Sequence, residues 1–238
     1  MMDIPKTFKE HFYELRNRLL FVASCFVIAF CGCYYFSTYL QGFLIIPLEP
    51  ILNQGRKLIY TNLPEAFFSE INTAFFVTAL LIFPILLSQI WLFFRPGLFA
   101  HEKKVFRFVM IAIPLLFYLG VVFAHAIVLP KAFNFFINFE HKELPLYFLP
   151  KISDYLNFIQ RLMFVFGLGF ELPVVLLILV KLNLIALNEL KTRWRLVVLI
   201  ICIISAIITP PDALSMIALA LPMIILYGGT LLVIQYFK

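Results

Sequence analysis

Long apolar runs separated by short charged clusters make up most of this sequence. Apolar residues fill the runs continuously instead of alternating with polar ones, which indicates membrane-spanning helices and excludes a transmembrane β-barrel. We predict an all-α fold: a polytopic membrane protein with six transmembrane helices in a single integral membrane domain, residues 1–238. The predicted spans are, in order, about 19–40, 71–94, 108–130, 155–180, 196–209 and 213–235.

The fifth run is too short to cross an ordinary bilayer. It has 13 residues, from Leu196 to Ile208, before the sequence Thr209-Pro210-Pro211. Such a helix rises about 20 Å, whereas the hydrocarbon core is about 30 Å thick. We therefore predict that helices five and six are short, shielded by the other helices or placed where the bilayer thins. Asp212 follows the Pro-Pro turn and is expected to cap the sixth helix.

The distribution of basic residues predicts the orientation of the chain. Thirteen of the 19 lysines and arginines lie on the side that holds both termini, five lie on the opposite side, and Arg161 falls within a span. Because basic residues accumulate in cytoplasmic segments, both termini are predicted to be cytoplasmic. The net charge of +6 therefore reports topology. Since no basic block with interleaved aromatic residues occurs, we predict no binding of nucleic acid.

Composition excludes a water-soluble globule. The chain is 63% apolar and 13% charged, with a mean hydropathy of +0.99, against about 45–50% and about 25% in soluble domains. The common enzyme motifs for phosphate, zinc and serine chemistry are absent. The four histidines are scattered over different segments, and the four cysteines lie within apolar runs, where cysteine behaves as a small hydrophobic residue. We predict no enzymatic activity, no metal site and no cofactor.

One acidic residue lies in the middle of an apolar run. Glu171 occurs in Phe-Gly-Leu-Gly-Phe-Glu-Leu-Pro, residues 166–173. A charged group at this depth costs at least ~2.5–3.5 kcal/mol, so it is expected to face a cavity or a partner. An alternative function is a proton-coupled small-solute transporter that uses Glu171 as a relay. That alternative predicts internal repeats or paired broken helices, and the two halves show no repeat.

Other acids have ordinary structural interpretations when spacing alone is considered. Glu14 and Arg18 are four residues apart and can form an ion pair along a helix, and Glu102 lies in an exposed His-Glu-Lys-Lys turn. Glu65 and Glu70 lie on the outer side, in a stretch that by itself is compatible with a helix on the membrane surface.

Five motifs in order resemble the C subunit of the twin-arginine protein translocase. The first is His-Phe-Tyr-Glu-Leu-Arg-Asn-Arg-Leu, which resembles the family signature His-x-x-Glu-Leu-Arg-x-Arg-Leu. Together they cover nearly the whole chain. The motifs are residues 11–19, Pro-Glu-Ala-Phe-Phe at 64–68, Gln-Ile-Trp-Leu-Phe-Phe-Arg-Pro-Gly-Leu-Phe-Ala-His-Glu-Lys-Lys at 89–104, the Glu171 motif and Thr-Pro-Pro-Asp at 209–212.

The resemblance implies a function in protein export. It implies a receptor and scaffold in the bacterial inner membrane that binds the paired arginines of signal peptides on folded cargo, in export driven by the proton gradient. It implies as partners single-span subunits of the TatA/TatB type, membrane lipids and further copies of the chain. The residues implied at the cytoplasmic signal-peptide site are Glu14, Glu102, Arg16 and Phe93; Glu171 is the implied polar contact to a partner helix, and Pro47, Glu65 and Asp212 are the implied structural or functional residues on the outer side.

Two positions depart from the family pattern. Relatives carry a lysine shortly after Glu-Ala-Phe, where this chain has Asn72. The Ser-Pro that commonly precedes Glu-Ala-Phe is replaced by Asn62-Leu63-Pro64. Any role for a positive charge at the first position is therefore in doubt here, whereas the predicted cytoplasmic acids are unaffected.

Overall fold

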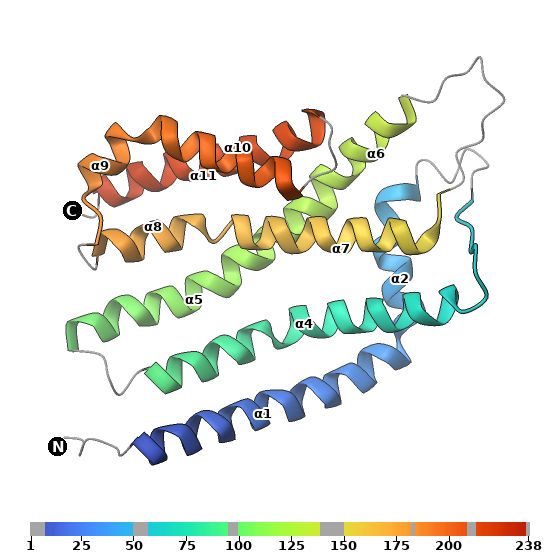
Figure 1. Ribbon diagram of the computed structural model, residues 1–238, viewed down its shortest axis with the longest axis horizontal. Helices are drawn as coiled ribbons and strands as arrows, with labels where there is room; N and C mark the ends of the chain where they lie inside the picture. The colour runs from blue at the N-terminus through green and yellow to red at the C-terminus, as the bar shows by residue number, and fades with distance from the viewer. Residues whose placement is uncertain are drawn as a thin grey trace. The chain divides into compact units, whose positions relative to one another are not determined.

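The computed structural model describes residues 8–49, 57–94, 100–138, 150–181, 184–208 and 213–236. Helices account for nearly all of these residues, and an isolated bridge pairs Ile59 with Lys151 (Figure 1). The chain divides into two units. Residues 1–45 and 60–114 form the first unit, and residues 46–59 and 115–238 form the second.

Two long helices, α1 (Phe8–Tyr35) and α4 (Glu65–Phe94), pack along each other in the first unit (Figure 1). Their contact includes an edge-to-face pair of Phe26 with Phe75, whose ring centroids are 5.3 Å apart. The short helix α2 (Ser37–Ile45) also packs on α4, where the amide of Gln41 donates a buried hydrogen bond of 3.2 Å to the hydroxyl of Ser69. The first part of α5 (Ala100–Phe123) completes this unit.

A π-helical turn interrupts the third predicted span of the chain, in the part of that span that belongs to the second unit. After α5, a π-helical turn η3 (Ala124–Val128) leads into α6 (Leu129–Asn138), and the N–H of Leu129 donates to the carbonyl of Ala124. Pro130 explains the turn, because its ring clashes with the carbonyl four residues earlier and it has no N–H to donate. The 3-10 turn η1 (Ile46–Leu48) buries Pro47 and contacts α6.

Small residues allow α5 and α7 (Ile152–Gly169) to approach each other closely. A Cβ atom added at Gly120 would lie 2.5 Å from the carbonyl oxygen of Phe166, and one added at Gly167 would lie 2.6 Å from the ring of Phe117. Phe117 and Phe166 are each 1% exposed. The core of the second unit therefore depends on backbone contact at this crossing.

The last two helices of the second unit form a hairpin that packs beside α8. The chain continues through α8 (Leu172–Lys181) and α9 (Leu187–Thr192) to α10 (Trp194–Ile208) and α11 (Ala213–Tyr236) (Figure 1). α11 contacts α8, α9 and α10. The hydroxyl of Tyr227 on α11 donates a buried hydrogen bond of 2.8 Å to the carbonyl of Leu190 on α9.

These helices confirm the predicted fold class, an all-α polytopic membrane protein. Within the described ranges, four stretches are long and apolar enough to cross a bilayer, and shorter apolar helices follow in α10 and α11. α10 has 15 residues and is the short fifth helix. Residues 65–70 belong to the first turns of α4, so this stretch continues into the second span instead of forming a separate surface helix. The long stretches are Lys9–Tyr35, Glu65–Phe93, Arg107–Asn134 and Ile152–Lys181.

Candidate functional site

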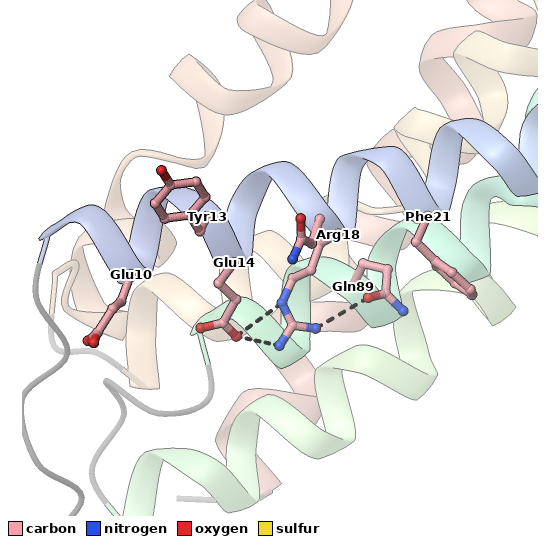
Figure 2. Close-up of a pocket in the computed structure, with 7 residues that line it drawn as sticks. Glu10, Tyr13, Glu14, Arg18, Phe21 and Gln89 are labelled. Atoms are coloured by element: carbon pink, nitrogen blue, oxygen red, sulfur yellow. Dashed lines mark hydrogen bonds and ion pairs between the residues drawn. The ribbon is translucent and has the colours of Figure 1, made fainter.

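The first turns of α1 and the last turns of α4 enclose an open groove of about 750 Å³ (Figure 2). Charged and polar side chains of α1 form one wall, and Gln89 of α4 forms the other. Two carboxylates and one guanidinium are among them, which gives the lining a net negative charge in a chain that is positive overall. The lining residues are Glu10, Tyr13, Glu14, Asn17, Arg18, Phe21 and Gln89.

Arg18 connects the two walls of this groove. Its Nη2 and Nε atoms donate to Oε1 of Glu14 at 2.5 and 3.2 Å, as the four-residue spacing predicts. Nη1 donates to Oε1 of Gln89 at 3.2 Å, and Nη2 also donates to the carbonyl oxygen of Leu92 at 3.2 Å. Figure 2 shows the Arg18 side chain between Glu14 and Gln89. The hydrogen bonds to Gln89 and Leu92 hold α1 against the end of α4, and the two to Glu14 fix its carboxylate at the groove.

The ion pair of Glu14 and Arg18 is partly buried. The side chains of Glu14 and Arg18 are 17% and 22% exposed. Water screens such a pair less than a fully exposed one, which strengthens the attraction between Glu14 and Arg18. Carboxylates bind guanidinium groups through two parallel, charge-assisted hydrogen bonds. The groove is therefore suited to a cationic ligand that carries arginine.

Two further predicted residues lie close to the groove. Phe93, which is half-buried at the end of α4, packs on the ring of His11 with centroids 4.7 Å apart. Arg16 is exposed on α1, and its guanidinium lies 5.0 Å from the centroid of the Tyr13 ring. Phe93 thus helps to join α1 to α4, whereas Arg16 packs on a residue that lines the groove.

The predicted residues outside the groove fall into different settings. Glu102 belongs to the first turn of α5, and its side chain lies outside the described residues, as does the whole of Asp212. Pro47 is buried in η1. The structure therefore places Glu14 in the groove and Phe93 against the start of α1, whereas Arg16 contacts the groove through Tyr13. The relation of Glu102 to these residues stays a prediction.

Glu65 forms the turn that starts α4. This carboxylate is 6% exposed, and its Oε2 accepts from the N–H of Thr61 at 2.7 Å, the hydroxyl of Thr61 at 3.1 Å and the N–H of Asn62 at 3.2 Å. Negative charge at a helix N-terminus is also favourable with respect to the helix dipole. These contacts account for an acid at this position by local structure.

Glu171 lies where α7 ends and α8 begins. Both carboxylate oxygens are buried, and neither has a hydrogen-bond partner of normal geometry among the described residues. The backbone of Phe117 is near enough to interact with the carboxylate electrostatically. The N–H groups of Val174 and Val175 donate to the main-chain carbonyl of Glu171, so the backbone is satisfied while the side chain is not. A buried acid of this kind is unfavourable unless something pairs with it.

Comparisons with known proteins agree with one another. A family model described as "Sec-independent protein translocase protein (TatC)" matches residues 10–222. The chain belongs to the TatC family. A TatC protein of Rickettsia prowazekii (strain Madrid E) is 40% identical over 235 residues, which are 98% of this chain and 94% of that protein. The corresponding protein of Escherichia coli (strain K12) is 32% identical over 217 residues, 91% and 83% of the two chains.

A solved structure extends the agreement to the fold. The crystal structure of the "Twin Arginine Translocase Receptor- TatC in DDM" superposes with a TM-score of 0.79 at 31% identity, covering 94% of this chain and 98% of that one. The predicted family is thereby confirmed, and the chain is a multi-pass membrane protein of the protein-transport class. The transporter alternative for Glu171 receives no support, because every protein named above is a translocase subunit.

Sequence reasoning missed part of the groove in this TatC-family chain. Spacing along one helix predicted the Glu14–Arg18 pair, but it assigned Arg18 no further role. Gln89 and the Leu92 carbonyl are 71 and 74 residues away from Arg18. No local pattern signals such contacts. Gln89 is the first residue of one of the family motifs, which was the available signal that it contributes to the site.

Proposed function

We propose that this chain is the receptor subunit of a twin-arginine protein translocase, and that the groove of α1 and α4 binds the paired arginines of signal peptides. The groove carries this proposal, because it presents the half-buried Glu14 carboxylate in a site of net negative charge. Glu102, Arg16 and Phe93 are proposed to contribute to the same site. The chain acts by binding and by organising partners, without catalytic turnover.

The proposed setting is the inner membrane of a bacterium, with both termini in the cytoplasm. The excess of basic residues on the side of the termini supports this orientation. With the six predicted spans in a single domain, the start of α1 and the end of α4 are then on the cytoplasmic side. A folded precursor in the cytoplasm can present its signal peptide there, before the proton gradient drives export.

The proposed partners include single-span subunits of the TatA/TatB type and further copies of this chain. Glu171 supports the first of these, because its buried carboxyl group has no hydrogen-bond partner of normal geometry among the described residues. A polar side chain on a partner helix is able to donate to it when the packing around the buried oxygens opens locally on association. Interhelical hydrogen bonds in membranes contribute about 0.6–2 kcal/mol, which corresponds to roughly three- to thirtyfold in affinity.

We expect Glu171→Leu to separate stability from partner binding. The variant keeps or gains thermal stability in detergent, because it removes a buried acid that lacks a hydrogen bond. Its association with the single-span subunits falls about three- to thirtyfold in quantitative co-purification. Gln160→Leu is the matched control, since Gln160 is a buried polar residue of α7 whose amide nitrogen has no hydrogen-bond partner among the described residues. Unchanged co-purification of Glu171→Leu contradicts the partner contact.

A binding measurement with a synthetic signal peptide tests the proposed function. The full chain in detergent is titrated with a fluorescent peptide that carries two consecutive arginines, and with the same peptide carrying two lysines. We expect the arginine peptide to bind and the lysine peptide to lose most of its affinity, because lysine cannot form bidentate hydrogen bonds with a carboxylate. Equal affinity for the two peptides excludes recognition of paired arginines at this groove.

A further inference from the structure

The turn between α9 and α10 carries exposed basic side chains beside an exposed tryptophan. Lys191, Arg193 and Arg195 are all exposed, and Trp194 is 50% exposed. Glu189 supplies one negative charge nearby. The guanidinium of Arg195 lies 5.7 Å from the centroid of the Trp194 ring. Residues 191–195 are called the basic turn below.

The cations of the basic turn have no charged partner within the part of the chain that the structure describes. None of its three basic side chains takes part in a hydrogen bond or an ion pair with another described residue. By contrast, Arg18 in the groove makes four hydrogen bonds. The positive charge of the basic turn is therefore available to an anion from outside the chain.

Contacts with the neighbouring helices hold the basic turn in place. Leu190, which precedes it, is 6% exposed, and its carbonyl accepts the hydrogen bond of 2.8 Å from the Tyr227 hydroxyl. Inside the turn, the N–H of Arg193 donates to the carbonyl of Glu189 at 2.8 Å. The basic side chains thus come from a segment that is hydrogen-bonded to α11 at Leu190 and runs from the last turn of α9 into the first turn of α10.

The basic turn ends where exposed apolar surface begins. Leu196, Leu199 and Ile200 on the first turns of α10 are 52%, 59% and 45% exposed. Tryptophan is enriched at the level of lipid headgroups, so Trp194 indicates where the membrane surface meets this helix. The 15 residues of α10 rise about 22 Å, less than the hydrocarbon thickness of about 30 Å. Of the two arrangements open to a short helix, shielding by other helices or a thinner bilayer, the exposed face of α10 favours the thinner bilayer.

We propose that the basic turn binds the headgroups of anionic phospholipids, with Lys191, Arg193 and Arg195 contacting the phosphates and Trp194 inserted at the interface. Charge complementarity supports an anionic occupant. The adjoining apolar surface of α10 favours a lipid over an acidic protein segment, because acyl chains cover that surface while the headgroup reaches the cations. Binding draws this leaflet toward the end of the short helix. This site shares no residue with the signal-peptide groove and does not depend on it.

Quenching of Trp194 by brominated lipids tests the proposal on the full chain. The chain has two tryptophans, Trp91 and Trp194, so Trp91→Phe leaves Trp194 as the reporter. This variant is reconstituted in nanodiscs of phosphatidylcholine that contain increasing fractions of brominated phosphatidylglycerol or brominated phosphatidylcholine. We expect brominated phosphatidylglycerol to quench Trp194 at lower fractions than brominated phosphatidylcholine does. A basic residue near an anionic surface contributes about 1 kcal/mol, so Arg193→Gln with Arg195→Gln lowers the preference by about 25-fold.

Matched variants separate the site from bulk charge. Lys57→Gln with Lys131→Gln removes the same charge from two exposed lysines elsewhere and retains the preference. Arg193→Lys with Arg195→Lys is expected to keep the preference for phosphatidylglycerol. This result shows that the loss in Arg193→Gln with Arg195→Gln comes from charge and not from misfolding. The proposal is overturned if the preference for phosphatidylglycerol survives in Arg193→Gln with Arg195→Gln. It is also overturned if that preference falls equally in Lys57→Gln with Lys131→Gln. Displacement of phosphatidylglycerol by inorganic phosphate alone, or by a polyglutamate peptide, also overturns the proposal. These outcomes assign the cations to a free ion or to an acidic protein segment.

Discussion

A chain carrying Glu14→Gln is expected to bind a twin-arginine signal peptide about 10- to 100-fold more weakly than the parent. Glutamine has the shape of glutamate and can still accept the hydrogen bonds from Arg18, so the wall of the groove keeps its geometry. What is lost is the negative charge, and a hydrogen bond to a charged group contributes about 1.5–3 kcal/mol. The measurement is a fluorescence anisotropy titration of the labelled peptide into the detergent-solubilised chain.

The matched control for this prediction is Glu189→Gln. It removes the same charge from an exposed acid of α9, outside the groove, and is expected to leave the affinity within about twofold. Adding Glu102→Gln to Glu14→Gln is expected to abolish measurable binding, because both proposed carboxylate partners of the two arginines are then neutral. Binding and export that persist in the double variant contradict the assignment of these acids.

Gly120→Ala is expected to lower the thermal stability of the chain substantially. The added methyl group would lie 2.5 Å from the carbonyl oxygen and 2.9 Å from the carbonyl carbon of Phe166. These are backbone atoms of α7, so no rotamer change relieves the overlap and the two helices must separate. Overpacking typically costs about 1–3 kcal/mol, which outweighs the gain of about 1 kcal/mol that alanine brings to a helix interior. The unfolding midpoint in detergent, followed by thiol reactivity or intrinsic fluorescence, measures the loss.

Two other glycines serve as comparisons for Gly120. Gly228 lies within α11, and an added Cβ would meet no atom of another described element within 4 Å, so Gly228→Ala is expected to leave the midpoint unchanged or raise it. At Gly167 the obstacle is the ring of Phe117, a side chain, so Phe117→Leu is expected to relieve part of the damage of Gly167→Ala. The same second change is not expected to rescue Gly120→Ala. A Gly120→Ala chain as stable as the parent contradicts the close crossing of α5 and α7.

The sequence alone determined the class of the protein and its local elements. Continuous apolar runs predict membrane-spanning helices because the transfer of each side chain into lipid depends on that residue and its neighbours in the chain. The short fifth helix followed from counting residues before Thr209-Pro210-Pro211, and the Glu14–Arg18 pair followed from the four-residue repeat of a helix. Family motifs then added the roles of residues, which hydropathy does not encode.

The tertiary structure decided which distant residues meet. Gln89 and the Leu92 carbonyl join Arg18 because α4 packs along α1, a contact across more than 70 residues that no local periodicity encodes. Packing likewise decided that Gly120 meets the backbone of Phe166 and that the Glu171 carboxyl group is buried without a hydrogen bond of normal geometry among the described residues. Hydropathy determines that a helix lies in the membrane, but the direction in which each of its side chains faces depends on the shapes of the neighbouring helices.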